Sequence, residues 1–353
     1  KGDLCGYAKD EFWNQPAFNE ASAERKQQLR ETVNVSVYTP GNPQGRGLSI
    51  PLVPEGLGEL SSFDRELVAN YSASALGNMM GYTRKQSDVA CIGILSHAFQ
   101  LLSTRYPDRP LALQSIIEMV HRGDPELVNA VGRLNPKTFD KLVQDLSTLQ
   151  LSRARTLSTE DESLNIDSLL GSGEHAQPNR TQLSIISTKF LGDRLDIEFW
   201  MSQFLMAVKR WGDENPSPEL QAVFLFDEAD LYLPAQSKPS TKGPMEDLLK
   251  RARSAGIGLL LATQSPGDFD YKCRDNIRTW LVGKIKEPTA IRKMKPMLSE
   301  CKDDVSLRLP AQKTGEFHLL RDGEATAFQA DRSLLVTEQL AEEEILTLAK
   351  RAG

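Results

Sequence analysis

Two adjacent carboxylates stand at the end of a short apolar run, where phosphate chemistry could take place. Asp227 and Glu228 directly follow residues 222–226, all of which are apolar. Unpaired charge is costly to bury, so we expect the pair at an accessible edge. Mg²⁺ prefers one or two carboxylates together with phosphate oxygens and water. We predict that Asp227 binds the metal. Glu228 is predicted to act on an attacking water, either as its general base or by orienting it. The alternative is that both merely cap the following segment.

An amide side chain, Gln264, ends a second apolar run, residues 258–263. It could bridge the attacking water and the γ-phosphate of a nucleotide, and so sense which nucleotide is bound. Without the acidic pair in the neighbouring run, Gln264 would be an ordinary surface amide.

Three basic residues, Lys250, Arg251 and Arg253, lie on a predicted helix between the two runs. An arginine can offset the charge that develops on a transferred phosphoryl group, and its guanidinium binds phosphate oxygens in a bidentate manner. We predict that Arg253, or next Arg251, is such an arginine finger, supplied to a neighbouring subunit. Lys250 is expected to bind the nucleotide, as is Asp3 near the start of the chain. The alternative is a solvated basic face.

These residues need a sheet whose strands end at one edge. A short unbroken apolar run is typical of a strand covered on both faces, and open α/β sheets place ligands beyond the carboxyl ends of their strands. Strand patterns alternate with helical ones along most of the chain. The further strand patterns are residues 33–38, 183–187, 279–285, 316–320 and 325–330. The fold predicted is α/β, a mostly parallel sheet flanked by helices.

A long stretch with helical periodicity interrupts this pattern. We predict four or five helices in it that pack around a core of their own, as an all-α insertion. The chain then divides into an N-terminal part of the core (1–58), the insertion (59–157), a polar connector (158–182) and the rest of the core (183–353).

The phosphate-binding Walker A motif, GxxxxGK[ST], does not occur in the sequence. In P-loop folds this motif follows a central strand, and a sheet without that strand would leave two rows of unpaired backbone groups. We therefore expect the motif upstream of Lys1 or on another chain, and the absence of an initiator Met favours the first. Residues 1–3 are interpreted as the end of a strand. The 353 residues alone are not expected to bind nucleotide tightly or to hydrolyse it.

Together the motifs resemble the HerA/FtsK superfamily of P-loop ring ATPases, and HerA-like helicase-domain proteins in particular. The resemblance rests on LFDEADLYLP (225–234), on the segment from LLKRARSAGIGLLLATQSP to VGKIKE (248–287) and on TGEFHLL (314–320). KGD at the start is similar to the end of the family's second strand.

The resemblance implies a P-loop NTPase fold of the RecA/FtsK type and a hexamer that hydrolyses ATP with Mg²⁺ between subunits. It also implies translocation of duplex DNA through a pore, and a nuclease or other effector as partner. It assigns Walker B roles to Asp227 and Glu228, a sensor role to Gln264 and a trans-acting role to Arg251 or Arg253. The alternatives are a conjugative or secretion-type motor ATPase, and a catalytically silent ring-assembly module.

Composition restricts where a polyanion could bind. The net charge is −6, so DNA contact must be local. The candidates are Lys238 and Lys242 in one loop, and a second group with several basic residues in the segment 284–295; solvated charge is the alternative. That second group is Lys284, Lys286, Arg292, Lys293 and Lys295. Four scattered cysteines and no apolar run of membrane-spanning length favour the cytoplasm, without membrane contact.

Overall fold

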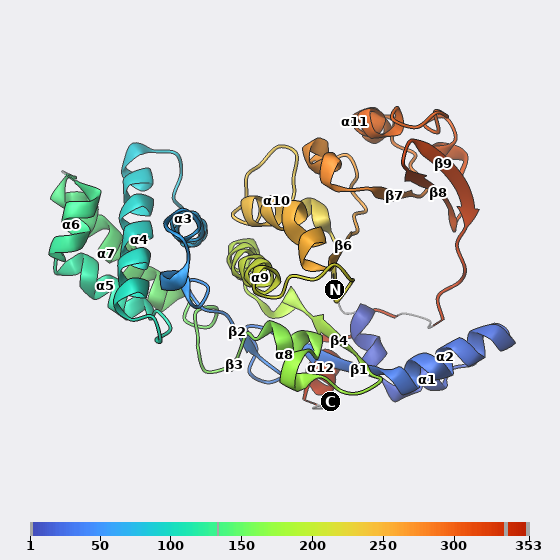
Figure 1. Ribbon diagram of the computed structural model, residues 1–353, viewed down its shortest axis with the longest axis horizontal. Coiled ribbons are helices and arrows are strands. Elements are labelled where there is room, and N and C mark those ends of the chain that lie inside the picture. Colours follow the sequence, from blue (N-terminus) through green and yellow to red (C-terminus); the bar gives the residue numbers. More distant parts are fainter. Residues whose placement is uncertain (1–2, 133, 335–337, 351–353) are drawn as a thin grey trace. The chain divides into compact units, whose positions relative to one another are not determined.

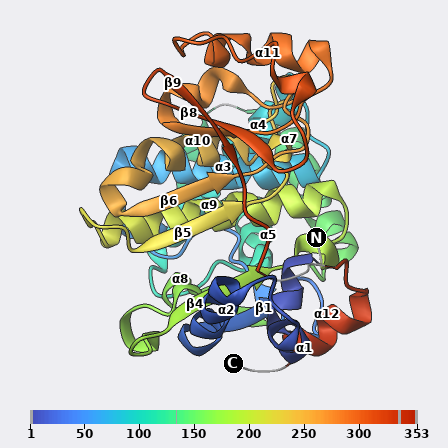
Figure 2. The same ribbon diagram turned by 90° about the vertical axis from the view of Figure 1, so that its right-hand side faces the viewer.

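The computed structural model describes residues 3–132, 134–334 and 338–350. They form two compact units, one from residues 1–208 and 334–353 and the other from residues 209–333. Figures 1 and 2 show the elements of each. Among the described residues, no helix is both long and apolar enough to cross a membrane.

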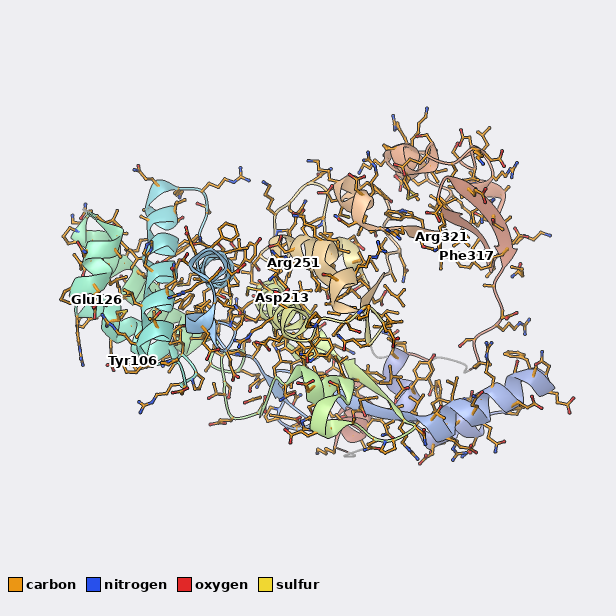
Figure 3. The ribbon with its side chains drawn as sticks, in the orientation of Figure 1. Tyr106, Glu126, Asp213, Arg251, Phe317 and Arg321 are labelled. Carbon is orange, nitrogen blue, oxygen red and sulfur yellow. The ribbon has the colours of Figure 1, made fainter. Side chains whose placement is uncertain are left out.

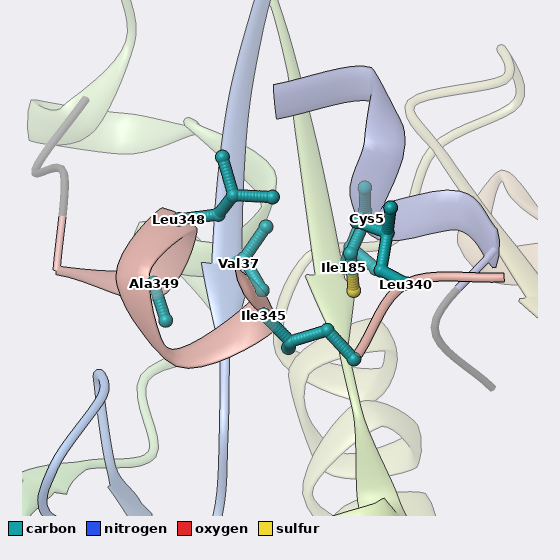
Figure 4. Close-up of a cluster of buried hydrophobic side chains, with 7 residues drawn as sticks. All are labelled: Cys5, Val37, Ile185, Leu340, Ile345, Leu348 and Ala349. Carbon is teal, nitrogen blue, oxygen red and sulfur yellow. The ribbon is translucent and has the colours of Figure 1, made fainter. Parts of the chain in front are cut away.

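A parallel pair of six-residue strands forms the larger sheet of the first unit. β1 (Val33–Tyr38) pairs with β4 (Thr181–Ile186) in register from Val33 and Thr181 onward. Residues near both ends of the chain share the hydrophobic core on this sheet, because η1 (Asp3–Ala8) and α12 (Glu342–Ala349) both pack on the two strands (Figure 4). The buried residues of this cluster are Cys5, Val37, Ile185, Leu340, Ile345, Leu348 and Ala349.

The strand end predicted at residues 1–3 is wrong for Asp3, and Lys1 and Gly2 lie outside the described residues. Residues from Asp3 onward form the 3₁₀ helix η1, and no described strand pairs with it. Cys5 is fully buried in the cluster of Figure 4, and a 3₁₀ turn satisfies backbone groups locally, without a partner strand. Lys9 fixes the end of this segment, because its ammonium bonds the carboxylates of Glu338 and Glu344 at 3.1 and 2.9 Å.

The helices predicted between residues 59 and 152 are all present. Side chains cap the first turns of three of them; for example, the Asp124 carboxylate accepts from the backbone N–H groups of Glu126 and Leu127. The helices are α3 (Ser62–Met79), α4 (Gln86–Arg105), α5 (Leu113–His121), α6 (Pro125–Val131) and α7 (Pro136–Ser152). Fully buried side chains fill the space between them: Leu76, Ile94, Leu95, Ile116, Leu127, Leu142 and Leu146.

Short elements complete this unit. Two more helices, α1 (Asp10–Asn14) and α2 (Glu20–Thr32), precede β1. Strand β2 (Leu48–Ser49) pairs in parallel with β3 (Glu162–Ser163), which is followed by α8 (Ile166–Leu170). The polar segment 158–182 thus contains a strand and a helix, and the buried Ile166 and Leu169 anchor that helix. The 3₁₀ turns are η2 (Leu57–Glu59), η3 (Gly173–His175) and η4 (Thr188–Phe190).

Helix α9 (Arg194–Glu214) begins in the first unit and ends in the second. Asp193 caps its start, since its carboxylate accepts from the N–H groups of Leu195 and Asp196. Arg153, at the end of α7, bonds the carboxylates of Asp193 and Asp196 at 2.6 and 2.7 Å. This ion pair therefore ties the helical block to α9.

The second unit is built on another parallel pair of strands. β5 (Ala222–Phe226) pairs with β6 (Ile257–Leu261), and α10 (Lys242–Arg251) with η6 (Ala252–Ala255) connects them. A residue with a side chain would not fit at Gly256, since φ is +62° and a Cβ would lie 2.1 Å from the carbonyl oxygen of Glu219. The turn into β6 therefore needs glycine at this position.

The composition of the run 222–226 predicted a strand covered on both faces, and this prediction is wrong. Ala222 and Phe226 are buried, whereas Val223 and Leu225 are 51% and 53% exposed. Leu260, opposite Leu225 in the register, is 54% exposed. Paired residues of parallel strands share a face, so one side of this sheet presents apolar side chains to solvent.

An antiparallel sheet closes the second unit. β7 (Thr279–Val282), β8 (Glu316–Arg321) and β9 (Glu324–Gln329) follow one another, and α11 (Pro288–Leu298) packs on them through Met294, Met297 and Leu298. The hairpin predicted across residues 321–323 is confirmed: Asp322 and Gly323 have φ of +52° and +77°, as a two-residue turn requires. The 3₁₀ turns here are η5 (Ala229–Leu231), η7 (Tyr271–Asn276) and η8 (Leu309–Ala311).

Candidate active site

The carboxyl ends of β5 and β6 bring the acidic pair and the Gln264 segment to one edge. Phe226 and Leu261 are opposite each other in the register, so the chain leaves both strands at the same level. Beyond them, the N–H of Ala262 donates to the carbonyl of Phe226 (2.9 Å), and the N–H of Ala229 donates to the carbonyl of Ala262 (2.8 Å). We call residues 227–235 the acidic loop and residues 262–270 the sensor loop. Their starts are held side by side.

Glu228 has a left-handed backbone, with φ of +54° and ψ of +48°. Such a conformation is uncommon for a residue other than glycine and costs about 1–2 kcal/mol. The Asp227 carboxylate accepts from the N–H of Glu228 (3.0 Å), and the carbonyl of Glu228 accepts from the N–H of Leu231 (2.9 Å). The chain therefore turns sharply at Glu228, and strained backbone of this kind clusters at functional sites.

A buried tyrosine lies beneath the acidic pair. Tyr232 is 8% exposed and contacts the ring of Phe226 edge-on, at 6.2 Å between centroids. Burial, and then the negative charges of Glu228 and Asp227, raise the pKa of Tyr232 to about 12. The hydroxyl therefore stays protonated at neutral pH and adds no charge beneath the carboxylates.

The sensor loop is bonded to the acidic loop beside Gln264. The hydroxyl of Thr263 donates to Asp230 Oδ1 at 2.5 Å and accepts from the N–H of Ser265 at 2.9 Å. The Gln264 side chain itself is exposed. Asp230 and Thr263 were not singled out in the sequence, although each lies within two residues of a predicted site residue.

A buried ion pair joins the far ends of the two loops. The Lys242 ammonium bonds Asp270 Oδ2 (2.6 Å) and the carbonyl of Pro234 (2.8 Å). Burial alone would raise the pKa of Asp270, but its bonds with Lys242 and with the N–H of Lys272 outweigh burial and lower that pKa. The N–H of Asp270 also donates to the carbonyl of Leu233 (2.8 Å). The two loops are thus linked along their whole length.

The interpretation of Lys242 as a nucleic-acid contact is wrong. Its side chain is 13% exposed and its ammonium is held by the ion pair described above. Lys238, in the same loop, is exposed. So are all five basic residues of the segment 284–295, although Lys293 donates to the carbonyl of Gly267 (2.6 Å).

The basic residues of α10 lie at the opposite edge from the acidic pair. α10 and η6 lead into the start of β6, where Gln221 N–H bonds the carbonyl of Gly256. Lys250, Arg251 and Arg253 are all exposed there. Arg251 has a carboxylate of α9 nearby, Asp213, at 3.9 Å (Figure 3).

The length of β6 separates these cations from Glu228. The strand has five residues, and at about 3.3 Å per residue it spans roughly 16 Å. Within one chain the structure therefore does not bring Arg251, Arg253 or Lys250 to the acidic pair. The side chain of Asp3 lies outside the described residues, and its predicted role stays a prediction.

The donor set at the edge suits a Mg²⁺ ion that is shared with a nucleotide. Among the described residues there is no group of three or more His, Cys, Asp or Glu side chains that could hold a metal ion. Asp227 is exposed at the strand end, and Mg²⁺ commonly takes one or two protein carboxylates, with water and phosphate oxygens as its other ligands.

Comparisons with known proteins show the fold. No family model matches the chain, and no curated protein sequence matches it significantly. Among solved structures, VirB4 of Thermoanaerobacter pseudethanolicus is 12% identical, with 90% of this chain and 88% of that one covered and a TM-score of 0.59. The bacterial conjugative coupling protein TrwB, in its unbound form, is 12% identical, with 90% and 81% covered and a TM-score of 0.52.

The chain has the α/β fold of P-loop NTPases, as its motifs predicted. The resemblance to the FtsK/HerA superfamily stated from the sequence agrees with this fold. TrwB has also been solved with an ATP analogue, and that structure covers 90% of this chain at a TM-score of 0.51 and 12% identity.

Proposed function

We propose that the chain carries the hydrolytic half of an ATP-driven DNA translocase that works as a homo-oligomeric ring, with six subunits expected. The observation that carries this proposal is the shared edge of β5 and β6, where the acidic loop holds Asp227 and Glu228 beside the sensor loop with Gln264. That is the arrangement a metal ligand, a base and a γ-phosphate sensor need.

Each side chain has a distinct task in hydrolysis. Asp227 holds Mg²⁺, which offsets the charge of the phosphates when it is bound. Glu228 accepts the proton of a water whose oxygen bonds to the γ-phosphorus, while the bond from that phosphorus to the bridging oxygen breaks; the products are ADP and inorganic phosphate. Gln264 orients the same water with its amide.

The position of the arginines supports a ring. Arg251 and Arg253 are exposed at the far edge of β6, about 16 Å of strand away from Glu228. They cannot reach a nucleotide at the acidic pair of their own chain, but they can reach one that is bound by the next subunit. The exposed lysines and arginines of residues 284–295 supply local positive charge for a DNA backbone. A nuclease or other effector remains the predicted partner, and the cytoplasm the predicted location.

A second candidate is a conjugative or secretion-type motor ATPase. It is favoured by the neighbours VirB4 and TrwB, which match 90% of the chain at TM-scores of 0.59 and 0.52. Stimulation of hydrolysis distinguishes the two functions: duplex DNA should stimulate a duplex translocase, whereas single-stranded DNA or a protein substrate should stimulate the conjugative motor.

The test is ATP hydrolysis by the full-length protein, with and without duplex DNA. Glu228→Gln keeps the size of the side chain but removes the base, so we expect kcat to fall at least about 100-fold. Glu66→Gln, a change at an exposed residue of α3 that has no part in the proposed site, is the matched control and should leave kcat unchanged. An absence of hydrolysis by the wild type would reject the ATPase and leave a silent ring-assembly module, and an unchanged rate in Glu228→Gln would reject the proposed site with Glu228 as its base.

A mixing experiment tests the trans-acting arginine. Glu228→Gln and Arg253→Ala should each be inactive alone, and a mixture should recover part of the activity because some interfaces then pair an intact Glu228 with an intact Arg253. Arg251→Ala and Lys250→Ala are tested in the same way, and a protein that stays monomeric by native mass measurement with ATP and DNA would exclude the ring.

A further inference from the structure

We propose that Asp230 and Thr263 are a positioning pair that holds Gln264 in register with Glu228. The proposal rests on the function proposed above and assigns to that site two residues that would act through Gln264 rather than on the reacting atoms. Asp230 lies two residues after Glu228, and Thr263 directly precedes Gln264. Their bond thus links the two loops close in sequence to both reactive groups.

The geometry of the bond suits a positioning role. Thr263 Oγ1 donates to Asp230 Oδ1 at 2.5 Å, and hydrogen bonds to an ionised carboxylate are short and strong. The same hydroxyl accepts from the N–H of Ser265 at 2.9 Å. The Thr263 hydroxyl therefore holds the residues on both sides of Gln264, Thr263 and Ser265, and links this part of the sensor loop to the acidic loop.

Other links do not replace this bond. On the strand side, the nearest is the backbone bond between Ala229 and Ala262; further along, the carbonyl of Asp268 accepts from the N–H of Ala235 at 2.8 Å. Between these two links, the bond from Thr263 to Asp230 connects the sensor loop to the acidic loop beside Gln264. Catalytic groups must be held to within about 0.5 Å, so loss of this bond should displace the amide.

A purely structural role for the pair predicts a different result. Asp230 could serve only to stabilise the turn η5, and Thr263 only to start the sensor loop. In that case removing the bond would lower thermal stability, and any loss of activity would follow the loss of folded protein. A positioning role instead predicts a fall in kcat with the fold and the KM for ATP preserved.

The experiment compares Thr263→Val with Thr263→Ser in the full-length protein. Valine keeps the shape and removes the hydroxyl, so we expect kcat to fall about 10- to 100-fold, with the melting temperature and the KM for ATP unchanged. Serine keeps the hydroxyl and should retain kcat within about threefold of the wild type. The matched control is Thr241→Val, which removes a buried hydroxyl that donates to the carbonyl of Tyr232, away from Gln264, and should leave kcat unchanged.

Combination with Asp230→Ala tests whether the two residues act through one bond. If they do, the double variant has the kcat of the worse single variant, because the second change removes nothing further. The proposal is overturned if Thr263→Val has wild-type kcat, if Thr263→Ser is as slow as Thr263→Val, or if the two single losses multiply.

A second readout separates failure of the pair from failure of the ATPase. The N–H of Ser265 bonds the Thr263 hydroxyl, so Thr263→Val should speed hydrogen exchange of the Gln264 and Ser265 amides about tenfold, whether or not ATP is hydrolysed. Unchanged exchange overturns the pair. A wild type without hydrolysis, in which exchange still rises in Thr263→Val, rejects the proposed ATPase but keeps the link between the loops.

Discussion

The left-handed backbone of Glu228 makes a prediction that separates folding from catalysis. Its φ of +54° forces the Cβ of any L-residue close to the following carbonyl, at a cost of about 1–2 kcal/mol. Glycine avoids this strain, but it loses about 0.5–1 kcal/mol more chain entropy on folding than alanine does. Glu228→Gly should therefore be more stable than Glu228→Ala by roughly 0.5–1 kcal/mol, although both remove the carboxylate and should lack ATP hydrolysis.

The assay is urea unfolding of the two variants side by side, followed by tryptophan fluorescence. The matched control is Lys250, an exposed residue within α10, where glycine should be less stable than alanine by about 1 kcal/mol. The order of the two variants should thus reverse between the positions. A less stable Glu228→Gly, with the expected order at Lys250, would refute the argument that Glu228 is strained.

Three further changes test the surroundings of the site and the helical block. Lys242→Met leaves the Asp270 carboxylate buried without its partner, so the free energy of unfolding in urea should fall by about 3 kcal/mol; a loss below about 1 kcal/mol would contradict the buried pair. Gly256→Ala should cost about 2 kcal/mol or more, because φ is +62° and the carbonyl of Glu219 occupies the space of a Cβ; a neutral result would contradict that geometry. Hydrogen bonds from Arg105 lower the pKa of Asp124 to about 2, from 3.8; the stability that this carboxylate contributes is complete above about pH 4 and is lost as the pH falls toward 2. In Asp124→Asn, the melting temperature should therefore depend less on pH over that range. An unchanged dependence on pH would contradict the lowered pKa of Asp124.

The parts of the site that follow from local pattern could be predicted from the sequence. Short apolar runs ending in polar residues identified β5 and β6, and parallel pairing then put Asp227, Glu228 and Gln264 at one edge. Helical periodicity likewise found the five helices between residues 59 and 152, because an amphipathic helix carries its packing pattern in its own sequence.

The parts that depend on non-local contacts were missed. Nothing in the sequence pairs Lys242 with Asp270 or Asp230 with Thr263, since each bond joins residues 28 or 33 positions apart. The left-handed turn at Glu228 had no signal either, because that conformation is ordinarily associated with Gly, Asn or Asp.

The opening segment shows the same limit. Whether such a segment forms a strand or a 3₁₀ turn depends on the residues that it packs against. Cys5 packs against α12, which lies at the other end of the chain. Its local sequence therefore could not decide between the two.

The half-exposed side chains of Val223, Leu225 and Leu260 also affect how this protein can be handled. A polypeptide limited to residues 209–333 would present this face to water beside strands with open backbone edges, the combination that drives intermolecular β-pairing. Such a fragment should therefore associate through this face. Replacing Val223 and Leu225 with threonine and lysine would be the first step toward a fragment that remains dispersed.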